Sequence, residues 1–119
     1  MIEIVKVSEQ GVVEIAIHGK LQEGDIKEIT PKIDQIIREK NNISIVLNAS
    51  EFEGWQDLDA LVAHFTFVRD HQKKARKLAF VAGKKWQEIL VHVLSSMVQP
   101  EVKVFHSDEL ANAHAWVTS

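Results

Sequence analysis

The chain has 119 residues, of which 45% are hydrophobic and 26% charged, with a formal net charge of −3 and no cysteine. These values are typical of a globular protein, and the length allows a core of its own, so we expect residues 1–119 to form one domain. The absence of cysteine excludes disulfides, thiolate zinc sites and cysteine nucleophiles.

The first half of the chain predicts two strands, a helix and a third strand. Residues 2–7 and 12–18 alternate weakly between apolar and polar side chains, and Gly11 suits a hairpin turn between them. Helical spacing of isoleucines follows over 25–40, where Pro31 predicts either a kink or a short helix before a longer one. Residues 43–47 are continuously apolar, which is typical of a strand buried on both faces.

The second half continues the alternation of helix and strand. Helices are expected over 56–70 and 84–98 and after Ser107, with strands at 78–82 and 102–105. In the first of these helices, the side chains expected to face inward are Leu58, Leu61, Val62, Phe65 and Val68. Strands that alternate with helices need crossover connections, so we predict an α/β domain with a mostly parallel sheet and an antiparallel hairpin at its start.

Two features of the sequence bear on location. Residues 1–6 lack the basic and then apolar layout of a signal peptide. No run approaches the roughly 18 apolar residues that a membrane-spanning helix needs. We therefore expect a cytoplasmic protein whose only membrane contact is peripheral.

Short motifs in a fixed order connect the chain with a known family. They are Gly19, Asp25, 52–55 (Phe-Glu-Gly-Trp), 78–86 (Leu-Ala-Phe-Val-Ala-Gly-Lys-Lys-Trp), Phe105 and 113–116 (Ala-His-Ala-Trp). With its order of elements, the chain resembles the SpoIIAA-like family over nearly its whole length. That family shares its fold with STAS domains and with lipid-carrying CRAL-TRIO domains, so the resemblance implies this α/β fold and a role in binding.

The resemblance fails at the regulatory site of anti-sigma-factor antagonists. Those proteins carry a phosphorylatable serine at the start of the helix that follows the third strand. Here the matching stretch is 55–59, and Asp57 stands approximately at the serine position. A partner switch driven by phosphorylation there does not carry over. An acid in the first turn is also what the helix dipole favours.

Positive charge is concentrated in one segment. Residues 69–85 contain seven Lys or Arg and a single acid, Asp70, whereas the rest of the chain holds seven basic and sixteen acidic residues. Cations beside apolar surface suit an anionic, apolar partner. A solvated connector after a helix explains the same run, because cations stabilise the negative end of the helix dipole.

The helix expected over 84–98 carries more apolar side chains than one face needs. A stripe suited to packing on a sheet consists of Trp86, Leu90, Val93 and Met97, and the side chains outside it are Val91, Leu94 and Val98. This surplus predicts a dimer interface, a ligand pocket between helix and sheet, or shallow burial in a bilayer. Simple burial of the whole helix is the alternative.

No arrangement of residues predicts a reaction. Ser95 and Ser96 lie in an apolar helix without a strained nucleophile turn, and the six histidines show no spacing typical of metal ligands. The negative net charge and the lack of tyrosine argue against nucleic-acid binding. We therefore expect no catalytic residues, no metal, no cofactor and no nucleic-acid partner.

The preferred hypothesis is a non-enzymatic binding module for a small lipophilic, anionic ligand or an anionic membrane surface. The expected ligand-binding residues are Leu61, Phe65, Trp86, Leu90, Leu94 and Trp116 as apolar walls, with Lys84 and Lys85 for an anionic headgroup. The second hypothesis is a STAS-like regulatory module, with a homodimer burying the surplus apolar surface. Its expected partner-binding residues are Phe52, Trp55, Asp57 and Asp59.

Overall fold

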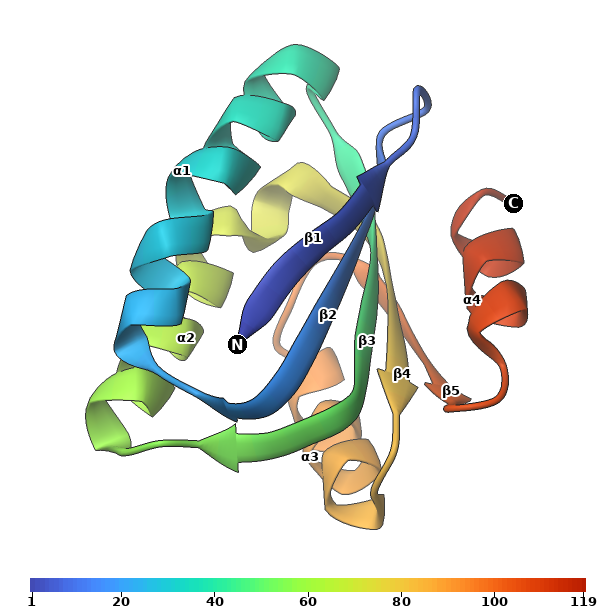
Figure 1. Cartoon of the computed structure of the whole chain (residues 1–119). Helices are drawn as coiled ribbons and strands as arrows, with labels where there is room; N and C mark the ends of the chain where they lie inside the picture. The colour runs from blue at the N-terminus through green and yellow to red at the C-terminus, as the bar shows by residue number, and fades with distance from the viewer.

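The computed structural model describes residues 1–119 as one five-stranded sheet with four helices (Figure 1). The strands are β1 (Ile2–Val7), β2 (Val12–Leu21), β3 (Ile43–Trp55), β4 (Ala75–Ala82) and β5 (Glu101–His106). The helices are α1 (Glu23–Lys40), α2 (Leu58–His71), α3 (Lys85–Ser95) and α4 (Leu110–Val117), and a 3-10 turn, η1 (Gln72–Lys74), follows α2. None of the helices has the length and apolar character needed to span a bilayer.

The strands lie in the sheet in the order of the chain, β1-β2-β3-β4-β5. β1 pairs with β2 antiparallel, and each later pair is parallel. The prediction of an α/β domain with a mostly parallel sheet and an N-terminal hairpin is therefore confirmed. Gly11 has a φ of 86° between β1 and β2, a conformation that strains other residues.

The helices form two layers, one on each face of the sheet (Figure 1). α1, α2 and α3 cover one face, and α4 covers the other. β4 supplies both layers because successive side chains of a strand point to opposite faces. Ala79 and Val81 pack in the core beneath α4, whereas Leu78 and Phe80 face the α2 and α3 side.

β3 is longer than the sequence predicted and curves around the lower end of the molecule (Figure 1). The segment Asn48-Ala49-Ser50 resembles a turn, but it continues the strand. The Asn48 side-chain oxygen accepts hydrogen bonds from the Ser50 N–H at 3.1 Å and the Ser50 hydroxyl at 2.7 Å. β2 also runs past Gly19 to pair with this extension, and together they carry Phe52 and Trp55 to the helix layer.

Helix α1 is one helix with Pro31 inside it. Of the two alternatives predicted at Pro31, a short helix before a longer one is therefore wrong. Proline removes one backbone hydrogen bond from a helix. Just before it, the Thr30 hydroxyl donates to the Ile26 carbonyl at 2.6 Å. Burial of the stripe Ile26, Ile29 and Ile33 against the sheet holds the helix together across the proline.

Helices α2 and α3 turn different faces to the sheet than predicted. Leu58, expected inside, is 70% exposed, and Val62 and Phe65 are exposed as well. On α3 the expected inner stripe is largely outside, with Trp86 and Val93 exposed, while Leu94 from the supposed surplus faces the sheet. The helix also ends at Ser95 rather than at Val98.

Candidate functional site

Two adjoining apolar cavities lie between the sheet and its three-helix layer. The α1/α2 cavity, of about 130 Å³, is enclosed by β1 to β4, α1 and α2, and 13 of its 17 lining residues are hydrophobic. The α2/α3 cavity, of about 140 Å³, lies between β3 to β5, α2 and α3, and 13 of its 16 lining residues are hydrophobic. The residues that line both are Leu47, His64, Val68, Leu78 and Val98. Such walls favour an apolar occupant.

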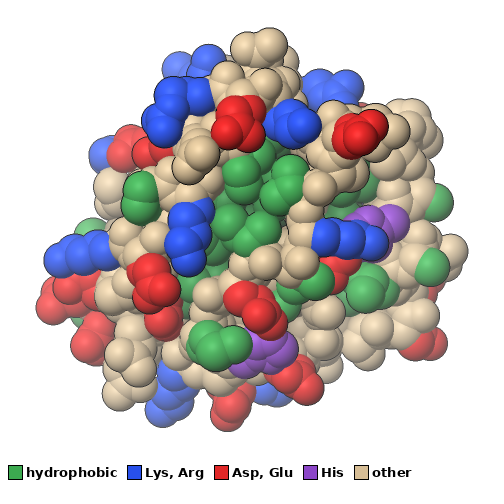
Figure 2. Space-filling model, turned by 45° about the horizontal axis from the view of Figure 1, so that its top comes forward, with side chains coloured by type: hydrophobic (Ala, Val, Ile, Leu, Met, Phe, Trp, Pro, Cys, Tyr) green, Lys and Arg blue, Asp and Glu red, His purple; other side chains and the backbone are tan.

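The apolar interior is visible from outside the molecule. On the face that carries α1 and the β1–β2 hairpin, hydrophobic side chains line a hollow bordered by lysine, arginine and acidic side chains (Figure 2). Apolar surface bordered by charged groups is typical of binding sites.

Four rings form an aromatic cluster (Phe52, Trp55, Phe65 and Trp86) in the wall of the α2/α3 cavity. The centroid of the Trp55 ring lies 5.2 Å from Phe52, 5.9 Å from Phe65 and 6.3 Å from Trp86. Aromatic rings attract one another at these separations. Phe65 and Trp86 are also about 40% exposed, so they connect the cavity with the solvent.

Exposed large apolar side chains lie on α2, α3 and the turn after α3. They are Leu58, Val62, Phe65, Trp86, Ile89, Val93 and Met97, the last of which is 73% exposed. Leu58 and Val62 line a groove between α1 and α2, whereas Phe65 and Trp86 line the α2/α3 cavity. The sequence predicted surplus apolar surface at Val91, Leu94 and Val98, but most of the exposed side chains are those expected to face inward. Val91, Leu94 and Val98 instead line the α2/α3 cavity.

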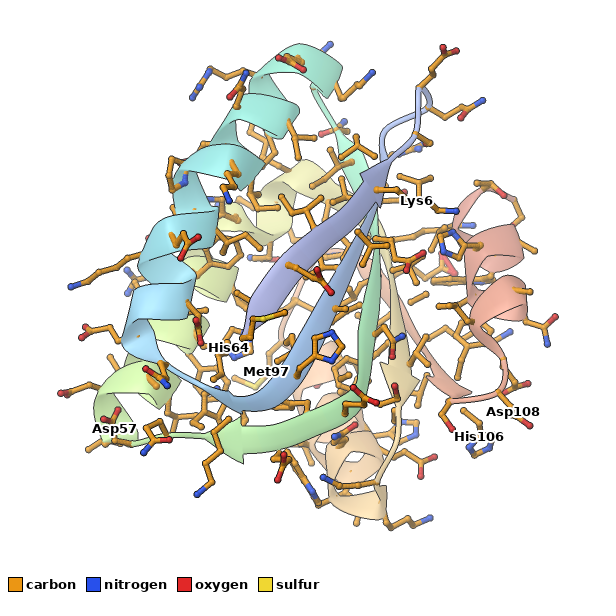
Figure 3. All side chains as sticks on the ribbon, in the orientation of Figure 1. Lys6, Asp57, His64, Met97, His106 and Asp108 are labelled. Carbon is orange, nitrogen blue, oxygen red and sulfur yellow. The ribbon has the colours of Figure 1, made fainter.

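His64, on α2, lies where the two cavities meet, and Figure 3 shows it on the helix side of the sheet. The indole Nε1–H of Trp55 donates to its Nδ1 at 3.0 Å. Burial lowers the pKa of His64 from 6.5 to about 4, so the ring is neutral at physiological pH. Since an indole only donates, Nδ1 carries no proton and the ring proton is on Nε2.

Gln87 fixes the start of α3 to β3. Its side-chain Nε2–H donates to the carbonyl of Phe52 at 2.9 Å, and its Oε1 accepts from the N–H of Gly83 at 3.0 Å. The Lys84 ammonium donates to the same Phe52 carbonyl at 3.3 Å. After α3, the N–H of Gln99 donates to the side chain of Gln72 at 2.6 Å. The helix is thus held near both ends above the cavity.

The basic run of the sequence is not a single patch in the structure. Lys73 and Lys74 lie in η1 before β4, and Lys84 and Lys85 follow its other end. An eight-residue strand separates them by roughly 26 Å. Lys77 instead donates to the carbonyls of Trp116 and Ser119 at the end of α4. Only Lys84 and Lys85 lie near the aromatic cluster.

The structure brings together most of the residues expected to bind a ligand. Phe65, Trp86, Leu90 and Leu94 line the α2/α3 cavity, as do Phe52 and Trp55 from the proposed partner face. Leu61 is half-buried and lines neither cavity.

Trp116 lies on the opposite face of the sheet, so it is not a wall of this site. The centroid of the Trp116 ring lies 6.1 Å from that of Phe105. The Lys77 ammonium lies 4.9 Å from the centroid of the Trp116 ring. The reason is that α4, which carries Trp116, packs on the other face of the sheet from α1, α2 and α3.

The acidic residues of the expected partner face belong to the start of α2. The Asp57 carboxylate accepts a hydrogen bond from the N–H of Ala60 at 2.9 Å and caps the helix. Asp59 is exposed in the first turn. Both positions stabilise the positive end of the helix dipole.

Other histidines contact carboxylates. His18 bonds Glu51 at 2.7 Å and Glu3 at 3.2 Å, and these bonds raise its pKa. His71 contacts Asp34 at 2.7 Å, and His114 contacts the buried Glu14 on the α4 side. No three His, Asp or Glu side chains come together as a metal-binding group.

The family assignment follows from a match of the SpoIIAA-like family model to residues 12–118. The chain belongs to the SpoIIAA-like family. One structure similar to this SpoIIAA-like protein is an uncharacterized protein of the DUF3478 family with a SpoIIAA-like fold from Shewanella loihica PV-4. It has a TM-score of 0.83 and 20% identity over 98% of this chain and 92% of that chain.

A second structure similar to this SpoIIAA-like protein is the anti-sigma factor antagonist SpoIIAA in its unphosphorylated form. It has a TM-score of 0.66 and 14% identity over 97% of this chain and 98% of that chain. At these identities the two structures establish the fold alone. No curated protein matches the chain. A SpoIIAA-like fold fits a regulatory interaction module.

Proposed function

We propose that this protein is a non-enzymatic module that binds a small lipophilic ligand in the α2/α3 cavity, with an anionic group of the ligand near Lys84 and Lys85. The observation that carries this proposal is the pair of adjoining apolar cavities beneath an aromatic cluster. An apolar cavity of about 150 Å³ binds benzene, so each cavity admits a group of about that size. Transfer of 150 Å² of ligand surface from water contributes about 4 kcal/mol.

Native mass spectrometry of protein purified from cells tests the ligand directly. We expect an adduct with the mass of a small lipophilic molecule on the wild-type chain. The substitution Leu94→Trp fills the α2/α3 cavity and should remove the adduct, whereas Val93→Trp on the exposed face should retain it. A wild-type chain without adduct that also fails to bind added lipophilic molecules would contradict the proposal.

The exposed apolar surface beside Lys84 and Lys85 supports a peripheral membrane variant of the proposal. Each lysine near an anionic membrane contributes about 1 kcal/mol, so Lys84→Glu with Lys85→Glu should weaken binding to anionic vesicles roughly 30-fold or more. The matched control is Lys27→Glu with Lys32→Glu on the exposed side of α1. Co-sedimentation with vesicles measures the binding of both double mutants. Equal binding of the two would contradict an electrostatic contribution of Lys84 and Lys85 to membrane association.

A second candidate function is regulatory binding of a protein partner or a second copy of the chain. It is supported by the fold shared with the anti-sigma factor antagonist and by Leu58, 70% exposed between Asp57 and Asp59. Light scattering after size-exclusion chromatography would then show a complex larger than the monomer. Leu58→Asp should dissociate that complex, and Lys32→Asp on α1 should not.

A further inference from the structure

His64 differs from the other polar side chains of the two cavities in its position or its partners. The oxygen of Gln72 accepts from the Gln99 N–H and its amide N–H has no partner in the chain, but Gln72 lines the α1/α2 cavity alone. Gln87 uses both of its amide atoms, and both ring nitrogens of His71 have partners, Phe67 and Asp34. The hydroxyl of Ser95 donates within its own helix. His64 is the polar side chain that lines both cavities, and only its Nδ1 has a partner in the chain.

The hydrogen bond from Trp55 decides which nitrogen of His64 is free to donate. Because the indole Nε1–H occupies the lone pair of Nδ1, the ring proton is on Nε2. Nε2–H makes no hydrogen bond within the chain, and it is not among the fully enclosed polar atoms without partners. It is therefore a donor available to a molecule in the cavities.

The surroundings of His64 select an uncharged acceptor. The cavities that it lines contain no Asp, Glu, Lys or Arg side chain. Burial keeps the ring neutral, so it offers no counter-charge to an anion. A carboxylate or phosphate placed there would lose its hydration without an ion pair, which is costly. A carbonyl oxygen loses much less and gains the hydrogen bond.

We propose that the Nε2–H of His64 donates a hydrogen bond to an uncharged carbonyl oxygen of the ligand, and that the two apolar arms beside this carbonyl occupy the α1/α2 and α2/α3 cavities. This assignment rests on the proposed function and specifies the ligand further. The ligand class is a ketone, ester or amide flanked by short alkyl or ring groups. An anionic group, where the ligand has one, extends past the aromatic cluster toward Lys84.

Two probe molecules that differ in one non-hydrogen atom test the hydrogen bond. Dibutyl ketone has a central carbonyl between two butyl arms, and its matched alkene has a methylene group in place of the oxygen. One neutral hydrogen bond should make the ketone bind roughly three- to tenfold more tightly to the wild-type protein. Tryptophan fluorescence measures the dissociation constants, because Trp55 and Trp86 line the cavity.

Two substitutions distinguish the contribution of His64 to binding from that of a neighbouring aromatic ring. His64→Phe keeps a ring in place but has no donor, so it should bind both probes with equal affinity. Trp86→Phe leaves the His64 ring and its hydrogen bond from Trp55 intact and should keep the preference for the ketone. A readout without substitution is the ¹⁵N resonance of Nε2 in the wild-type protein, which should shift with the ketone and not with the alkene.

The outcomes distinguish the two levels of the proposal. A ketone preference that disappears in His64→Phe, together with the Nε2 shift, supports the assignment. Equal binding of both probes to the wild type, or a preference that survives in His64→Phe, overturns the role of His64 and leaves the lipophilic site standing. If neither probe binds, the cavities are not a ligand site, and the proposed function is overturned as well.

Discussion

The buried side chain of Gln87 joins the start of α3 to the carbonyl of Phe52, to which its Nε2–H donates at 2.9 Å. Gln87 is 1% exposed, and its Oε1 also accepts from the backbone N–H of Gly83. A glutamine is rarely buried unless its polar atoms are paired, as they are here. The position of α3 over the cavity thus depends on a residue in the first turn of the helix itself.

Gln87→Leu should destabilise the protein by about 1–3 kcal/mol, because it leaves the Gly83 N–H without a partner and the Phe52 carbonyl with only the 3.3 Å hydrogen bond from Lys84. Urea unfolding measures the loss. The control is Gln35→Leu on α1, whose amide bonds Glu39 at the surface and whose replacement should change stability by less than about 0.5 kcal/mol. A loss for Gln87→Leu as small as that of the control would contradict the anchoring role.

Gly83→Ala should be among the more damaging substitutions in the chain. A Cβ at this position would lie 2.3 Å from the backbone oxygen of Ser50 and 2.8 Å from its Cα, so the β4–α3 connection must move away from β3. We expect weaker binding of lipophilic probes and a lower midpoint of thermal unfolding.

Gly24→Ala is the matched control, because a Cβ there meets nothing within 4 Å and Gly24 lies in α1. It should stabilise the protein by up to about 1 kcal/mol through helix propensity. If both alanines have the same effect, the close approach of Gly83 to Ser50 is not important for stability.

Stability should fall on acidification because of His64. Its pKa is about 4 in the folded protein and 6.5 in the unfolded chain, so the unfolded chain binds the proton first. The contribution is complete above pH 6.5 and is lost as the pH falls toward 4. From pH 7 to pH 5 it amounts to about 2 kcal/mol.

Urea unfolding of the wild type and of His64→Phe at both pH values isolates this effect. The wild type should lose about 2 kcal/mol more than the variant between pH 7 and pH 5. Contributions from the other histidines are common to both proteins and cancel in the difference. Equal losses would show that His64 titrates normally in the fold.

His18 should titrate in the opposite sense. Hydrogen bonds to Glu51 and, more weakly, to Glu3 raise its pKa above 6.5, so its contribution to stability is present below pH 6.5 and is lost as the pH rises through the raised pKa. In an NMR titration, Glu51→Gln should lower the pKa of His18 more than Glu3→Gln does. Glu39→Gln, on the far end of α1, should leave it unchanged. The reverse order for the two partners would contradict the geometry.

The order of strands and helices could be predicted because each boundary has its own local signal, such as Gly11 in the hairpin. The end of β3 could not be predicted from the sequence. Asn48 and Ser50 are typical turn residues, and only the hydrogen bonds between them, together with pairing to residues 18–21 of β2, keep the strand extended. Such long-range pairing leaves no periodic pattern in the sequence.

The inner faces of α2 and α3 were assigned incorrectly for a different reason. When apolar residues surround most of a helix, several rotations satisfy the period equally well. The structure places the polar Gln87 and the small Ala60 inside, and leaves Leu58 and Trp86 at the surface. Close packing and one buried hydrogen-bonded amide decided the rotation, and neither is visible as hydrophobicity.

His64 was missed as part of the site because, in the sequence, it is one of six histidines without metal-like spacing. A signal was nevertheless present. It is flanked by apolar residues in a helix and follows Trp55 by nine positions, across the β3–α2 connection. A histidine in such a position needs a partner for a ring nitrogen, and a nearby indole is a donor that can supply it.

Phe52 and Trp55 belong at once to the wall of the α2/α3 cavity and to the stretch that leads into the exposed start of α2. A molecule that displaced the Trp55 ring would therefore also alter the shape offered to anything that docks at Leu58. Thermodynamic linkage makes such an effect mutual: an effector inside the domain and a protein outside it would each change the affinity of the other by the same factor. The molecule in the cavity and the protein docked at Leu58 would then act on the same conformational equilibrium.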